Sequence, residues 1–188
     1  MGYELYNALG DKIVQSDLQD KMAWCSKGED LEFAFIKQYG TELELIINPK
    51  KNADPTVADF IHIGTNRPAD LKTQNTPFFT SKRYGVEPQN AITFNKIDLD
   101  RYRELYPNIL IYYSVEWIAT KIMFDSNRTI SVNPMAGVWR ISLKNLIPLC
   151  SEKNLHEYIQ RKNDVKGNAK SSYVVDLTSN GFKRLYYD

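Results

Sequence analysis

The chain has 188 residues, of which 43% are hydrophobic and 25% charged, so we expect residues 1–188 to form a single globular domain. No apolar run reaches the roughly 18–20 residues of a membrane span, and the first ten residues lack the basic and apolar regions of a secretory signal, which predicts a soluble cytoplasmic protein without a membrane partner. The net charge of +1 gives no indication of a nucleic-acid binder, although nine acidic and only five basic side chains lie in residues 1–50.

The beginning of the chain is expected to contain two helices. Apolar residues at a near-helical spacing predict a first helix up to Ser26. They are Ile13, Val14, Leu18 and Met22. Gly28 is a candidate interruption of this pattern, and a second helix should run from about Glu29 to Tyr39. It should end at Gly40, because glycine suits the left-handed position that follows many helices.

Three strands are expected next. Thr41–Asn48 alternates between polar and apolar residues before it turns apolar, and Val57–Ile63 alternates again. Ala69–Phe79 is the third, with a break near Pro77. A polar loop and a Gly-Thr-Asn-Arg-Pro turn separate the three segments. Such short connections predict an antiparallel meander.

The second half of the chain returns to this sheet. Asp98–Tyr106 predicts a short helix with Asp98 as its N-cap, and Asn108–Trp117 predicts a buried strand rich in β-branched and aromatic residues. The order helix, three strands, helix, strand predicts an α/β fold in which helices flank a central mixed β-sheet. Further strands are expected at 121–124, 129–132, 138–142 and 173–177, with a helix at 143–146 and a long loop after residue 154.

The residues that indicate chemistry lie on the second and third predicted strands. Side chains on a strand alternate between its faces, so Asp70, Lys72 and Gln74 should project from one face and Leu71 from the other. Asp59 lies on the preceding predicted strand, and the turn between the strands can bring it beside Asp70. Two carboxylates and a lysine would then meet at one end of a hairpin.

Two carboxylates and a lysine grouped in this way are suited to the hydrolysis of a phosphodiester. The reaction needs neutralisation of the charge that builds on the phosphoryl oxygens and a source of hydroxide near neutral pH. Mg²⁺ held by carboxylates can supply both, and a lysine can polarise the water or hold a phosphate oxygen. Asp59 and Asp70 are therefore candidate metal ligands, and Lys72 is a candidate catalytic residue.

These residues resemble the PD-(D/E)XK nuclease superfamily, the restriction-endonuclease-like fold. The match consists of Ala58-Asp59 followed by Asp70-Leu71-Lys72, with Gln74 as a supporting residue. Residues 27–32 are similar to the KGxxxE opening of archaeal Holliday-junction resolvases, and Glu32 occupies the position of its acid. The sequence departs from the family pattern in having Ala58 where a proline usually precedes the first aspartate.

The resemblance implies an αβββαβ core over about 27–117, followed by C-terminal additions over 119–188. It implies that Asp59 and Asp70 bind Mg²⁺, for which Mn²⁺ could substitute. It also implies that Glu32 completes or supports the metal site, and that Lys72 assists the attacking water. The implied activity is endonucleolytic cleavage of double-stranded DNA, of restriction or phage-recombination type. A homodimer is expected, because cutting both strands with one site per chain usually takes two copies.

Other interpretations remain open. Asp59 or Asp70 could be edge residues that pair with Lys72 or Arg67 at the surface, and Glu32 could be an acid near a helix start. The fold could serve as a non-catalytic DNA-binding module or as a protein-interaction domain. Several basic residues are candidates for DNA phosphate contacts or simply belong to surface loops. They are Lys82, Arg83, Arg161, Lys162 and Lys166.

Overall fold

A six-stranded mixed sheet forms the centre of the computed structural model, which describes residues 2–13, 21–158 and 170–187, with residues 21–29 and 187 described by their backbone alone. Its strand order is β13-β10-β7-β5-β4-β3. The strands are β3 (Leu45–Ile47), β4 (Phe60–His62), β5 (Arg67–Gln74), β7 (Leu110–Glu116), β10 (Ala136–Ser142) and β13 (Lys183–Tyr187). All neighbouring pairs are antiparallel except β5 and β7.

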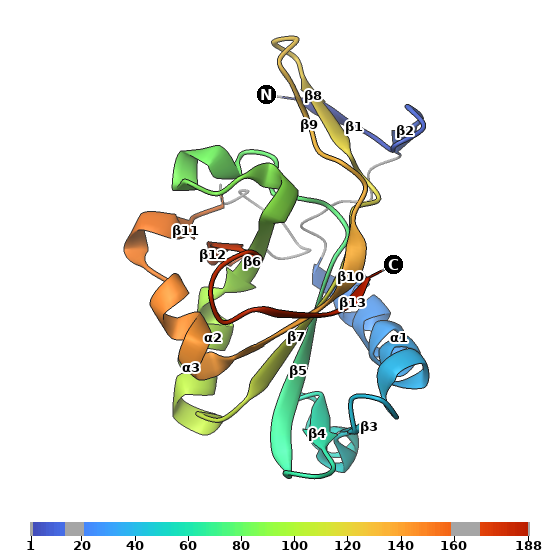
Figure 1. The fold of residues 1–188 in the computed structure, drawn as a ribbon, viewed down its shortest axis with the longest axis vertical. Coiled ribbons are helices and arrows are strands. Elements are labelled where there is room, and N and C mark those ends of the chain that lie inside the picture. Colours follow the sequence, from blue (N-terminus) through green and yellow to red (C-terminus); the bar gives the residue numbers. More distant parts are fainter. Residues whose placement is uncertain (1, 14–20, 159–169, 188) are drawn as a thin grey trace.

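Two smaller sheets accompany the central one. A four-stranded sheet of order β2-β1-β8-β9 projects from one end of the molecule (Figure 1). Its strands are β1 (Tyr3–Tyr6), β2 (Lys12–Ile13), β8 (Lys121–Phe124) and β9 (Thr129–Ser131). A three-stranded sheet of order β11-β12-β6 contains β6 (Ala91–Asn95), β11 (Leu155–His156) and β12 (Ser172–Asp176).

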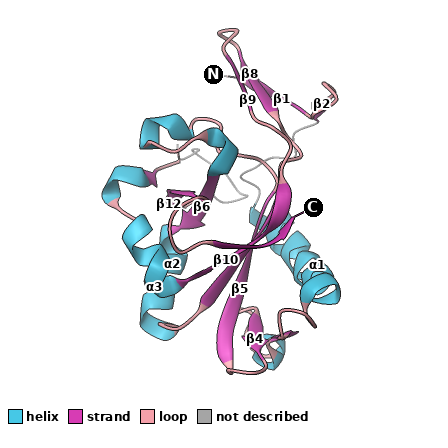
Figure 2. Cartoon of the chain, viewed as in Figure 1, coloured by secondary structure: helices cyan, strands magenta, loops and turns pink. Residues whose placement is uncertain are grey.

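Helices flank the central sheet on both sides, as Figures 1 and 2 show. α1 (Lys21–Tyr39) lies on one side, and α2 (Lys96–Leu105) and α3 (Leu143–Leu146) lie on the other. The short 3-10 segments are Pro49–Asn52, Ser81–Tyr84, Pro88–Asn90, Ile147–Leu149 and Glu152–Asn154. The expected α/β class with a central mixed sheet between helices is therefore confirmed.

Each face of the sheet has its own core because side chains alternate along the strands. On β7, Tyr112 packs with Phe35 of α1, Phe60 and Leu71. Tyr113, its neighbour, belongs to the opposite core, which contains α2, α3 and the three-stranded sheet. Both tyrosines are fully buried, as expected for a central strand with helices on both faces.

The order of elements from α1 to β7 agrees with the expected one. α1 is followed by the antiparallel meander β3, β4 and β5, and α2 then precedes β7, which is parallel to β5. β6 was not expected and lies between β5 and α2. The register places Asp70 beside Ile111 and Lys72 beside Tyr113.

The prediction of a first helix up to Ser26 is wrong for its beginning, where β1 and β2 form instead. Residues 14–20 of that prediction lie outside the described part of the chain. Gly28 does not interrupt α1, which continues to Tyr39. Gly40 does follow the helix, but its φ is not positive. A Cβ at Gly40 would lie 2.5 Å from the carbonyl oxygen of Ile36, so close packing of the backbone explains the glycine.

Several strand boundaries also differ from the predictions. The first two meander strands are only three residues long, because turns occupy residues 41–44 and 54–57. β5 ends at Gln74, well before Phe79, and the last strand, β13, was not expected. Asp98 lies in the first turn of α2, whereas Asn95 holds the N-cap position.

Candidate active site

β5 brings Asp70 and Lys72 together on the face of the sheet that α2 covers. Their side chains project from the same side of the strand, and Lys72 Nζ lies 2.8 Å from Asp70 Oδ2. Leu71 projects into the core beneath α1 instead. The alternation that the sequence predicted for this strand is confirmed.

The carboxyl of Asp70 is buried, which disfavours its charged form. Only 4% of the residue is exposed. Burial raises the pKa of its carboxyl to about 6, against 3.8 for an ordinary aspartate; Lys72 lowers the pKa and the charge of Asp59 raises it. Asp70 Oδ2 is paired with the ammonium of Lys72 at 2.8 Å, and hydrogen bonds from Lys72 and Tyr102 lower the pKa of the carboxyl without offsetting its burial. This carboxylate is therefore ion-paired, yet burial still disfavours its charged form.

Asp59 lies directly before β4 rather than within it. Its Oδ2 accepts a hydrogen bond of 2.9 Å from the backbone N–H of Leu71, which fixes the carboxylate beside the peptide that follows Asp70. The hairpin between β4 and β5 produces this contact, because Phe60 pairs with Ala69 in the ladder. The two aspartates are thus neighbours, as the sequence predicted.

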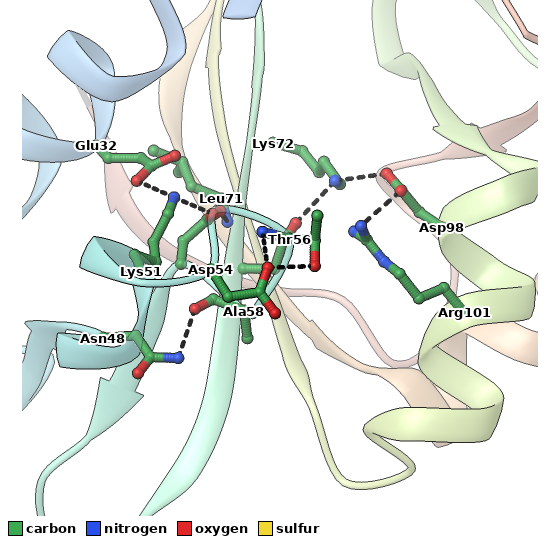
Figure 3. Close-up of polar contacts among 12 residues, drawn as sticks. Glu32, Asn48, Lys51, Asp54, Thr56, Ala58, Leu71, Lys72, Asp98 and Arg101 are labelled. Carbon is green, nitrogen blue, oxygen red and sulfur yellow. Dashed lines mark hydrogen bonds and ion pairs between the residues drawn. The ribbon is translucent and has the colours of Figure 1, made fainter.

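Lys51 occupies the other oxygen of Asp59. Its Nζ lies 2.7 Å from Asp59 Oδ1 and also pairs with Glu32 of α1 (Figure 3). Burial lowers the pKa of Lys51, but the hydrogen bonds that its ammonium donates to Asp59 and Glu32 outweigh that effect and raise it, so the ammonium stays charged. Glu32 reaches the site only through this lysine in the described structure.

Lys72 is held by α2 as well as by β5. Its Nζ lies 2.7 Å from Asp98 Oδ2, and Asp98 Oδ1 accepts a hydrogen bond of 3.2 Å from Arg101 (Figure 3). Burial lowers the pKa of Lys72, but the surrounding negative charges, Asp70 first among them, raise it well above its ordinary value. The lysine is consequently a fixed cation and not a proton acceptor near neutral pH.

The remaining predicted site residues lie elsewhere. Gln74 accepts a hydrogen bond of 3.0 Å from the backbone N–H of Thr93, so it links β5 to β6. Lys82 pairs with Glu87, and the guanidinium of Arg83 lies 3.0 Å from His156 Nδ1. Arg161, Lys162 and Lys166 lie outside the described residues.

The charged side chains around β5 do not neutralise one another completely. Four carboxylates and three cationic side chains meet around β5, so the fully ionised network carries a net charge of −1. Its members are Glu32, Asp59, Asp70 and Asp98 together with Lys51, Lys72 and Arg101. Within the described ranges, no three acidic, histidine or cysteine side chains are grouped so that they could together hold a metal ion. Asp59 and Asp70 are neighbouring carboxylates, and Mg²⁺ commonly uses one or two carboxylates and completes its shell with water and phosphate.

Three members of this network could not be assigned to it from the sequence. Lys51 belongs to the 3-10 segment Pro49–Asn52, and a loop residue has no periodicity that reveals its neighbours. Asp98 and Arg101 were detectable as an i, i+3 pair on α2, but not as partners of Lys72. Their contact with Lys72 depends on how α2 packs against the sheet.

Comparison with known proteins adds no relative: no protein-family model, no curated protein and no solved structure matches the chain.

Proposed function

We propose that the protein is a Mg²⁺-dependent endonuclease that cleaves double-stranded DNA, with its site at Asp59, Asp70 and Lys72. One observation carries the proposal: Asp70 is buried with a raised pKa, between a second carboxylate and a fixed lysine. An acid of this kind costs stability and is typical of a functional site. The succession α1, β3, β4, β5, β6, α2, β7, in which β6 belongs to a separate sheet, supports a restriction-endonuclease-like core, and the family resemblance implies that Asp59 and Asp70 are metal ligands.

The residues suit the chemistry in distinct ways. Asp59 has its carboxylate oriented by the Leu71 N–H, and Asp70 is a neighbouring buried carboxylate whose charged form additional positive charge would stabilise. A divalent cation bound by these acids would neutralise phosphate charge and acidify a water molecule. Lys72 would remain a cation and hold a phosphate oxygen or orient the water, a role that needs charge and position but no loss of its proton. A homodimer would supply a site for each strand of the duplex.

A second candidate is a DNA-binding module without catalysis. It is favoured by the ion pairs that Lys51 and Lys72 make, because they neutralise most of the acidic charge without a metal. Such a module would bind duplex DNA equally well in EDTA and in Mg²⁺. Divalent ions would also leave its thermal stability unchanged, whereas ions that bind only the folded protein would raise it.

Plasmid cleavage tests the proposal. The wild-type protein should nick or linearise supercoiled plasmid in Mg²⁺ and not in EDTA. Asp70→Ala and Lys72→Ala should each lose this activity while retaining the circular dichroism spectrum of the wild type. Lys12→Ala is the matched control, because Lys12 is an exposed lysine paired with Glu4 in the separate four-stranded sheet, and it should cut normally. Undiminished cutting by either site variant would show that the reaction takes place elsewhere.

A further inference from the structure

Lys51 stands out as a positive charge placed between two acids of the proposed site. Its Nζ contacts Glu32 and lies 2.7 Å from Asp59 Oδ1. The side chains of Lys51, Glu32 and Asp59 are only 14%, 15% and 14% exposed. At such low exposure an ion pair is little screened by water and salt.

The backbone around Lys51 is attached to the strand that carries Asp59. The buried Asn48 accepts a hydrogen bond of 3.1 Å from Lys50 N–H and donates one of 2.8 Å to the carbonyl of Ala58. The N–H of Asn48 also donates to the carbonyl of Asp59 at 2.8 Å. These bonds fix where the Lys51 side chain begins relative to Asp59, while its four-carbon stem leaves the ammonium free to move.

Asp59 keeps its orientation independently of Lys51. Its Oδ2 is held by the Leu71 N–H, so Oδ1 is the oxygen available to a cation, and Lys51 occupies it. A divalent ion bound to Oδ1 and an ammonium at 2.7 Å from the same atom would repel each other at close range.

We propose that Lys51 is a tethered cation that neutralises Glu32 and Asp59 in the metal-free protein and must move away before a divalent ion can bind these acids. The inference rests on the proposed metal site and adds a positioning residue that sets its affinity. Lys51 holds the acids together until metal is present, so it stabilises the empty site and weakens metal binding.

Two lysine variants test this inference by Mn²⁺ titration calorimetry and thermal melting of the metal-free protein. Lys51→Met removes the charge and keeps most of the stem; it should bind Mn²⁺ at least tenfold more tightly than the wild type and melt at a lower temperature without metal. Lys50→Met removes the same charge from the adjacent, exposed lysine and should change the Mn²⁺ affinity by less than twofold. This control separates the local competition from a general change in net charge.

The results distinguish the two proposals. If the wild type binds Mn²⁺ and Lys51→Met binds it equally or more weakly, the role of Lys51 is refuted and the metal site stands. If folded wild type and folded Lys51→Met both fail to bind Mn²⁺, the metal site itself is refuted along with it. If Lys51→Met does not fold, Lys51→Gln, whose amide can still donate to the two carboxylates, replaces it. That neutral variant should bind Mn²⁺ at least threefold more tightly than the wild type, and an unchanged affinity would overturn the inference.

Discussion

Replacement of Asp70 by asparagine should stabilise the protein at neutral pH. The carboxyl has a pKa of about 6 in the folded protein because it is buried, and an ordinary aspartate has 3.8. A pKa difference of one corresponds to about 1.4 kcal/mol, so the ionised form costs about 3 kcal/mol of folding free energy once the pH exceeds 6. Asparagine resembles the neutral acid and avoids this cost.

The pH dependence of the effect follows from the direction of the shift. Between about pH 4 and pH 6 the folded protein keeps a proton on Asp70 that the unfolded chain loses, so the free energy of unfolding falls as the pH rises through this window. Below about pH 3 the acid is neutral in both states. Asp70→Asn and the wild type should therefore differ by less than about 1 kcal/mol at pH 4 and by about 3 kcal/mol above pH 6.5, with the variant the more stable.

Urea unfolding followed by circular dichroism from pH 4 to pH 8 in EDTA measures this difference. Asp100→Asn is the control, because Asp100 forms an exposed i, i+4 pair with Lys96 within α2, and its loss should change stability by less than about 0.5 kcal/mol. Parallel stability curves for the wild type and Asp70→Asn, or a variant that is less stable at pH 8, would refute the reasoning about the buried carboxyl.

Three further outcomes follow from the same geometry. Lys72→Met should lower the free energy of unfolding at pH 8 by about 3 kcal/mol, because it leaves buried acids without their cation, and adding Asp70→Asn should recover part of the loss in urea melts. Gly40→Ala should cost about 1–3 kcal/mol in the same assay, since its Cβ would lie 2.5 Å from Ile36 O, whereas Gly64→Ala should cost clearly less because its nearest neighbour is a flexible side chain. Mn²⁺ should raise the melting temperature of the wild type, with a stabilisation of about 2.7 kcal/mol when its concentration is 100 times the dissociation constant; an unchanged melting temperature at millimolar Mn²⁺ would count against a metal site.

The central part of the fold could be predicted because its signals are local. Short polar connections indicated the meander, and a run of β-branched and aromatic residues indicated β7. The relation between Asp70 and Lys72 needed only the two-residue period of a strand, and their 2.8 Å contact agrees with it. Asp59 could be placed beside them because a short turn joins β4 to β5.

The terminal parts of the chain could not be predicted because their strands pair with distant segments. β1 pairs with β8, so that Leu5 lies opposite Ile122, and β13 pairs with β10. Nothing near residue 5 reveals a partner more than a hundred positions away, and the apolar residues before Met22 suggested a helix instead. β6 was missed for a similar reason, since it pairs with β12.

Only part of the candidate site could be predicted from the sequence, because some of its contacts form between segments that are distant along the chain. Glu32, Asp59, Asp70 and Lys72 carried recognisable motifs, whereas Lys51 and Asp98 acquire their roles through packing of a loop and of α2. Because of these residues, Asp59, Asp70 and Lys72 are all ion-paired in the metal-free protein. Metal binding therefore has to compete with side chains of the protein itself.

Anomalous diffraction from a crystal soaked in Mn²⁺ tests the proposed site most directly. The account predicts one strong peak within about 2.5 Å of carboxylate oxygens from both Asp59 and Asp70, with Lys51 Nζ displaced from Asp59. An ion that binds only elsewhere, or a site that retains the Lys51–Asp59 pair at saturating Mn²⁺, would contradict it.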